Sequence, residues 1–224
     1  DAARRLGDPL AGTLSIGVIP TVSPYLLPDA APAIRRAHPR LTVRWREDKT
    51  EVLARELHAG RLDAALLALE ADLGGPLQRE VIGRDRFLLA TPRSHPLARR
   101  ARPARLDDLR GARLLLLDDG HCLRDQALSV CAGARTEELA FRATSLPTLA
   151  QMVSAGAGVT LLPHLAVATE SRRADLAVRP LADERAFRTL ALVWRPSSPL
   201  GPALRKLAGT IRASYEKGAR GASG

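Results

Sequence analysis

Short apolar runs alternate with amphipathic segments in the first part of this chain, and the alternation limits the possible fold more than any other feature. Residues 14–19, 41–45 and 64–69 have the length and composition of strands. Residues 26–37 and 51–57, which separate them, repeat their apolar positions at helical spacing. Strands that are apolar on both faces are typical of parallel sheets covered by helices on both sides. The pattern therefore predicts an α/β unit.

Local signals mark where these elements begin and end. Ser23-Pro24 indicates a turn, Thr50 is placed as the N-cap of the helix that follows it, and Gly60 ends that helix. The alternation then restarts further along the chain, which predicts a second α/β unit. Its expected elements, together with those of the C-terminal part, are strands at 86–90, 114–117, 139–142, 159–162 and 188–194 and helices at 123–130, 147–155 and 199–215.

The chain is strongly basic, with a formal net charge of +10 at pH 7. Clustered cations bind nucleic acid by neutralising phosphates. Here the 34 basic residues are scattered along the chain, and all of them except Lys49, Lys206 and Lys217 are arginines. Aromatic residues make up 3% of the sequence, which leaves few rings to stack on bases. The composition therefore argues against a nucleic-acid-binding surface.

Two cysteines are notable for their neighbours and their spacing. Cys122 directly follows His121 and lies two residues before Arg124, and nearby positive charge favours the reactive thiolate. Cys131, the other cysteine, follows nine positions later. If the segment is helical, the two Cα atoms are roughly 13 Å apart, beyond the ~7 Å limit for a disulfide. A disulfide then requires the helix to open, and the alternative is a pair of buried, inert thiols.

The sequence predicts a cytoplasmic location. It contains no run of about 20 apolar residues that could cross a membrane. Its first residues lack the apolar segment of a secretory signal. In the cytoplasm a disulfide between the two cysteines is expected to be transient, catalytic or sensory rather than structural.

Other thiol and metal chemistries fit the cysteine spacing poorly. A phosphatase-like loop needs an arginine six residues after its cysteine, where this chain has Leu128. A thioredoxin-type site needs two residues between its cysteines. A zinc site built from His121, Cys122 and Cys131 lacks an evident fourth ligand, and adjacent ligands give poor tetrahedral geometry. We therefore expect no metal and no cofactor.

The order of four motifs resembles the regulatory domain of the LysR-type transcription regulators, and within that family its hydrogen-peroxide sensors. The resemblance covers nearly the whole chain. It implies an α/β fold of two Rossmann-like subdomains, similar to a type 2 periplasmic binding protein. The motifs that carry it are residues 19–28, 118–127, 141–146 and 158–163.

The resemblance also implies how the chain is divided. Residues 1–11 would be the end of a linker helix, and the winged helix-turn-helix that precedes this helix in the family is absent from the sequence. Residues 12–82 with 189–217 would form the first regulatory subdomain, and residues 83–188 the second, with both cysteines. Residues 218–224 are glycine-rich and are expected to be a disordered tail.

The same resemblance implies a mechanism. Hydrogen peroxide would oxidise Cys122 to a sulfenic acid, Cys131 would resolve it by forming a disulfide, and the changed conformation would alter dimer packing to control transcription. Among the residues implied to hold peroxide or support the thiol, we expect Asp125 to orient Arg188. The full implied set is Thr21, Thr50, His121, Arg124, Asp125 and Arg188.

The implied partners are hydrogen peroxide, a second copy of the chain in a homodimer or tetramer, and a thiol reductant such as glutaredoxin or thioredoxin. DNA would be bound only through the absent winged helix-turn-helix, and no membrane partner is expected. Two alternatives remain open. One is a regulator of the same fold that binds a small metabolite and has incidental cysteines, and the other is a thiol peroxidase. We expect a sensor rather than an enzyme.

Overall fold

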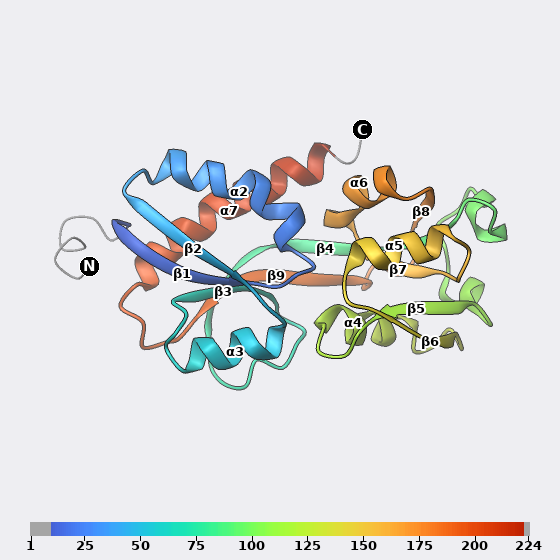
Figure 1. Ribbon diagram of the computed structural model, residues 1–224, viewed down its shortest axis with the longest axis horizontal. Coiled ribbons are helices and arrows are strands. Elements are labelled where there is room, and N and C mark those ends of the chain that lie inside the picture. The colour runs from blue at the N-terminus through green and yellow to red at the C-terminus, as the bar shows by residue number, and fades with distance from the viewer. Residues whose placement is uncertain (1–9, 222–224) are drawn as a thin grey trace. The chain divides into compact units, whose positions relative to one another are not determined.

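The computed structural model describes residues 10–221, with side chains to residue 218. The chain divides into two compact units, one that runs to Arg84 and resumes at Thr189, and one formed by Asp85–Arg188. Strands β4 (Gln78–Pro92) and β9 (Phe187–Trp194) each pass through a boundary, so two strands connect the units (Figure 1). Within residues 10–221, no helix is both long and apolar enough to cross a membrane.

The first unit contains the parallel sheet that the sequence predicts. Strand β1 (Gly12–Val18) pairs in parallel with β2 (Leu41–Glu47) and with β3 (Ala64–Ala68), and β9 joins β3 antiparallel. Every residue of β3 is buried, as expected for a strand covered on both faces. Figure 1 shows helices on both faces of the sheet, with α2 and α7 packed together on one and α3 on the other. The helices are α2 (Ser23–Ala37), α3 (Thr50–His58) and α7 (Gly201–Gly221).

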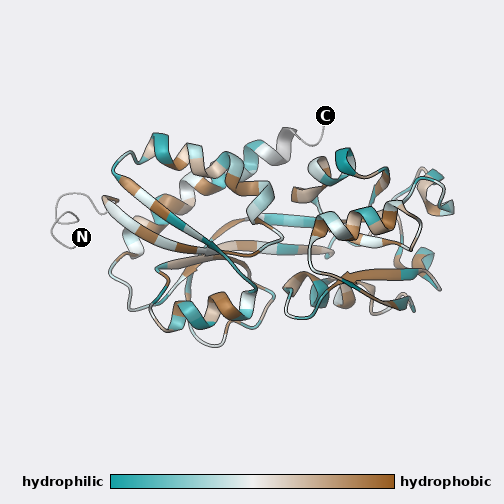
Figure 2. Cartoon of the chain, in the orientation of Figure 1, coloured by the Kyte–Doolittle hydropathy of each residue, from teal (hydrophilic) through white to brown (hydrophobic). Residues whose placement is uncertain are grey.

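The second unit is a mixed α/β assembly. Strand β4 pairs antiparallel with β7 (Thr160–Pro163) and β8 (Leu176–Pro180). Strand β5 (Arg113–Leu117) pairs in parallel with β6 (Glu137–Ala143). In Figure 2, β5 is hydrophobic along most of its length, whereas α3 of the first unit alternates hydrophobic and hydrophilic residues. The remaining elements are α4 (Cys122–Cys131), α5 (Leu146–Ser154), α6 (His164–Arg173) and the short 3₁₀ helices η1 (Pro96–Arg99) and η2 (Leu106–Leu109).

Gly158 explains one of the sequence motifs physically. It lies between α5 and β7, and the following residue, Val159, forms a parallel bridge with Leu114 of β5. A Cβ atom at Gly158 would lie 2.3 Å from the carbonyl oxygen of Arg113, so the close approach of the two backbones requires glycine here. The motif is therefore a packing requirement of the second unit.

Helix boundaries differ from the sequence-based expectation at two places. Helix α2 begins at Ser23 rather than after a turn at Ser23-Pro24, because proline is tolerated in the first turn, where a backbone N–H has no helical partner. Thr50 is the first residue of α3, whose N-cap is Lys49, and its side chain does not cap the helix. The expectation that Thr50 is the N-cap is therefore wrong.

The two ends of the chain also depart from expectation. Helix α7 continues to Gly221, so residues 218–221 are helical and the expected disordered tail is wrong for them. Residues 222–224 lie outside the described residues. Of the expected linker-helix segment 1–11, Leu10 and Ala11 are described and neither is helical, whereas residues 1–9 lie outside the described part.

Candidate functional site

Helix α4 carries both cysteines, one at each end. Cys122 is its first residue and Cys131 its last, and their residue exposures are 8% and 3%. At 1.5 Å per residue, the two Cα atoms are roughly 13 Å apart. Neither thiol is in a disulfide. The helical expectation for this segment is confirmed, and in this conformation the two sulfur atoms cannot bond or share one metal ion.

Cys122 lies at the N-terminus of α4, where the helix itself favours negative charge. His121 is the N-cap residue, is buried, and has an extended backbone, although its side chain does not cap the helix. The first backbone N–H groups of a helix have no helical acceptors, and the helix dipole is positive at this end. A thiolate at the first helical position is therefore stabilised by the helix itself.

Arg124, in the same turn, is held by two carboxylates. Its guanidinium forms 2.8 Å ion pairs with Asp119 and with Glu138 of β6, and Glu138 also binds Arg142. Burial opposes the charge of Arg124, but the two carboxylates outweigh it and hold its pKa above the ordinary value. One guanidinium nitrogen, Nη1, is buried without a hydrogen-bond partner among the described residues. Arg124 is therefore a fixed cation in the first turn of α4, two residues after Cys122.

Cys131 has a different environment. Burial raises the pKa of its thiol to about 11, because desolvation penalises the thiolate. At neutral pH this thiol is protonated and weakly nucleophilic while α4 is closed. The two cysteines therefore differ in electrostatics as well as in position.

Gln126 was missed by the sequence analysis. It lies four residues after Cys122 on α4, so the two side chains share a helix face. Its side chain is buried, and both its amide oxygen and its amide nitrogen lack partners among the described residues. Buried polar atoms are normally hydrogen-bonded, so this amide can serve a polar ligand. The four-residue spacing from Cys122 was the available sequence signal.

Arg188 is fully buried, and its partner is Asp85. The Nε and Nη2 atoms of Arg188 donate to one Asp85 oxygen at 3.0 and 2.9 Å. The expectation that Asp125 orients Arg188 is therefore wrong. Asp125 lies in the first turn of α4 but is exposed.

The first unit contributes the remaining two predicted residues, Thr21 and Thr50. In the parallel pair β1–β2, Val18 is in register with Glu47. Thr21 and Thr50 each follow this register pair by three residues, so both lie at the carboxyl edge of the sheet. Both are buried, and the Thr50 hydroxyl has no hydrogen-bond partner among the described residues. Ligands of open α/β sheets bind at this edge.

The structure thus groups the predicted residues by unit. His121, Cys122, Arg124 and Asp125 lie together at the start of α4.

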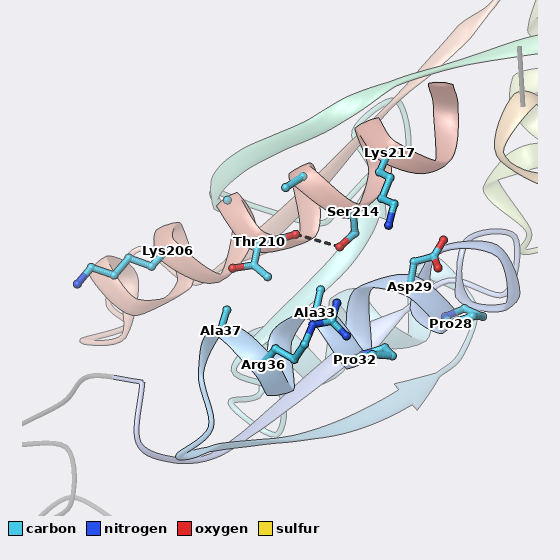
Figure 3. A pocket seen from close by; sticks show the side chains of 12 residues that line it. Pro28, Asp29, Pro32, Ala33, Arg36, Ala37, Lys206, Thr210, Ser214 and Lys217 are labelled. Carbon is cyan, nitrogen blue, oxygen red and sulfur yellow. Dashed lines mark hydrogen bonds between the residues drawn. The ribbon is translucent and has the colours of Figure 1, made fainter. Parts of the chain in front are cut away.

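A separate groove of about 810 Å³ between α2 and α7 contains none of the predicted site residues. Small side chains such as Ala33 line it between α2 and α7, and Arg36 and Lys217 are among its cations (Figure 3).

Comparison with known proteins first defines the class. Residues 7–216 match the LysR substrate binding domain. The chain therefore belongs to this family, whose members are transcription regulators, and the periplasmic-binding-protein-like α/β fold expected from the sequence is confirmed.

Individual relatives define the group within that class. A hydrogen peroxide-inducible genes activator from Pectobacterium carotovorum is 45% identical over 218 residues, which are 95% of this chain and 70% of the relative. The reduced form of OxyR has a TM-score of 0.83 and 41% identity, covering 93% of this chain and 98% of that one. An H2O2-bound cysteine-to-serine mutant of OxyR from Corynebacterium glutamicum has a TM-score of 0.88 and 32% identity, and the match covers 96% of this chain and 68% of that one. The chain belongs to the OxyR group of peroxide-responsive regulators.

Proposed function

We propose that this chain senses hydrogen peroxide through Cys122 and reports it by forming a disulfide with Cys131. The observation that carries the proposal is the arrangement of α4, with one buried thiol in its first turn, two residues before the fixed cation Arg124, and the other buried thiol at its C-terminus. The similarity to a structure of an OxyR mutant with bound H2O2 supports peroxide as the ligand.

The first chemical step is oxidation of Cys122. Its thiolate attacks one oxygen of hydrogen peroxide, a sulfur–oxygen bond forms, and the oxygen–oxygen bond breaks. The departing hydroxide takes a proton and leaves as water, and Cys122 becomes a sulfenic acid. This step needs a stabilised thiolate and donors that hold the departing oxygen.

Several residues suit those needs. Thr50 and Gln126 have buried polar atoms without partners among the described residues, and Arg124 and Arg188 are buried or half-buried cations. We assign them, with Thr21 and His121, to holding peroxide or supporting the thiolate. Asp125, which is exposed, stays a weaker member of the predicted set.

The second step is disulfide formation. The Cys131 thiolate attacks the sulfur of the sulfenic acid, and the hydroxyl group leaves as water after protonation. Overall, two thiols and one peroxide give one disulfide and two waters. Because α4 separates the cysteines by roughly 13 Å, the helix must open first. Opening also exposes Cys131 to water, which lowers its raised pKa and makes it a better nucleophile.

The output is a change of shape in the second unit. We propose that it alters packing between two copies of the chain in a dimer or tetramer, and that a winged helix-turn-helix outside this chain binds the DNA. A cytoplasmic thiol reductant such as glutaredoxin or thioredoxin would restore the two thiols.

A test separates this sensor from its alternatives. The Cys131→Ser variant is exposed to stoichiometric hydrogen peroxide, and sulfenic acid is trapped with dimedone and located by mass spectrometry. We expect one adduct, at Cys122, and none in the matched Cys122→Ser variant. An unmodified Cys122 would contradict the proposal and favour a metabolite-binding regulator, whereas rapid multiple turnover with added reductant would favour a thiol peroxidase.

A further inference from the structure

Asp85 makes three hydrogen bonds inside the second unit, of which the two from Arg188 are buried and the one from Leu165 is partly buried. One carboxylate oxygen accepts from Nε and Nη2 of Arg188 at 3.0 and 2.9 Å, and the other accepts from the backbone N–H of Leu165 at 3.0 Å. Both side chains of the ion pair have 0% exposure. Asp85 thus links β4, β9 and the first turn of α6.

This arrangement fixes the guanidinium group of Arg188 rather than merely neutralising it. Two N–H groups on one edge of the guanidinium bind a single oxygen, so the plane of the group is set and its remaining N–H groups point away from Asp85. The carboxylate is itself held from its other oxygen by the N-terminus of α6, whose dipole favours a negative charge there. A planar cation held in this way has little freedom to rotate.

The position in the chain adds to the argument. Asp85 and Arg188 are the first and last residues of the second unit, directly after and before the two boundaries between units. Leu165, the third member, lies about 80 residues from Asp85 in sequence. The hydrogen bonds therefore tie together the beginning, the end and an internal helix of the same unit.

We infer that Asp85 is a positioning residue for peroxide sensing, which orients Arg188 so that its remaining N–H groups serve the Cys122 site. The inference rests on the proposed function, in which Arg188 supports the oxidation of Cys122. Asp85 acts through Arg188 and does not touch peroxide.

The test measures how fast Cys122 is oxidised. All variants carry Cys131→Ser, and the second-order rate constant with hydrogen peroxide is followed by dimedone trapping. Asp85→Asn keeps the side-chain shape but removes the charge, and we expect at least a tenfold slower oxidation. The matched control is Asp183→Asn, because Asp183 also accepts from a backbone N–H and a guanidinium, both of Arg185, but in an exposed ion pair. We expect the control to react within twofold of the parent.

A double-mutant cycle distinguishes positioning from general loss of structure. If Asp85 acts only through Arg188, adding Asp85→Asn to Arg188→Gln slows oxidation no further than Arg188→Gln alone. Additive losses would overturn the inference. Arg188→Lys keeps the charge but loses the two-pronged contact, so we expect it to react nearly as slowly as Arg188→Gln. If Asp85→Asn does not fold, Arg188→Lys tests the inference in its place. Oxidation of Cys122 in Arg188→Lys at the same rate as in the parent would overturn the inference.

The outcomes also distinguish failure of this inference from failure of the proposed function on which it rests. If Cys122 is not oxidised in the parent, the proposed function fails. If Cys122 is oxidised and Arg188→Gln is slow, but folded Asp85→Asn reacts within twofold of the parent, only the role of Asp85 fails.

Discussion

Cys122 and Cys131 begin and end the same helix, α4, with both thiols buried. Roughly 13 Å of helix separates their Cα atoms, although only nine sequence positions do. The same ten residues can bring the sulfur atoms into contact once they are no longer helical. The helix therefore acts as a barrier to the disulfide, and the redox state of the cysteines becomes linked to the stability of α4.

Oxidation should open α4 and leave the rest of the second unit folded. We expect amide hydrogen exchange in residues 122–131 to lose its helical protection when the Cys122–Cys131 disulfide forms, because the bond is incompatible with the helix. Exchange in α5 serves as the internal control and should change little. Equal protection of α4 in the reduced and oxidised protein would contradict the helix-opening mechanism.

The raised pKa of Cys131 predicts how pH affects α4. The closed helix keeps the Cys131 proton up to about pH 11, whereas the open form ionises near pH 8.5. The closed helix is therefore fully stabilised below about pH 8.5, and it loses about 1.4 kcal/mol for each pH unit from there towards the raised pKa.

Alkylation of Cys131 in the Cys122→Ser variant measures this effect. In the folded protein, the rate should keep rising tenfold per pH unit beyond about pH 8.5, because the closed protonated form remains the main species. The same variant in denaturant should level off above about pH 8.5. A folded protein whose rate levels off at that same pH would show that burial does not control this thiol.

Thr50 offers a test in which stability and function move in opposite directions. Its hydroxyl is buried without a partner among the described residues, and such a group costs ~1 kcal/mol or more. Thr50→Val should therefore raise the free energy of unfolding by about 1 kcal/mol, while slowing Cys122 oxidation if the hydroxyl holds peroxide. Urea unfolding and peroxide kinetics measure the two effects.

Thr160→Val is the matched control. Thr160 is also buried, but its hydroxyl donates to the carbonyl oxygen of Leu115 at 2.8 Å. Removing this donor should lower the free energy of unfolding by about 1–3 kcal/mol. If Thr50→Val destabilises the protein as Thr160→Val does, the Thr50 hydroxyl is not a free ligand-binding group.

The elements that the sequence predicts well are those with a single strong physical cause. The run Ala64–Ala68 is buried on both faces, as expected for a strand of a parallel sheet that helices cover on both sides. The start of α2 was misplaced because Ser23-Pro24 favours both a turn and a first helical turn. Only the packing of the folded unit decides between those two structures.

The residues of the candidate site also divide into those that local sequence spacing can predict and those that it cannot. Residues near Cys122 on one helix, such as Arg124, could be found from local spacing, and Gln126 could have been found by the same reasoning. Asp85 could not, because 103 residues separate it from Arg188 and no local pattern links them. Asp125 was assigned to Arg188 by charge alone, and charge does not specify which of several carboxylates the fold brings near.

Glu138 provides a final prediction about the first turn of α4. Its carboxylate on β6 binds Arg124 of α4 and Arg142, so it ties the helix to the neighbouring strand. The Glu138 side chain is 33% exposed, and partly exposed ion pairs contribute up to about 1 kcal/mol. Glu138→Gln should therefore speed amide exchange in residues 123–127 by up to about fivefold, since 1 kcal/mol is that factor in an opening equilibrium.

Glu137→Gln is the control, because Glu137 is the exposed neighbour on the same strand. High salt should reduce the difference in amide exchange rate between Glu138→Gln and the parent, because salt screens partly exposed charges. A difference that is unchanged in high salt would mean that Glu138 holds α4 through packing rather than through its charge.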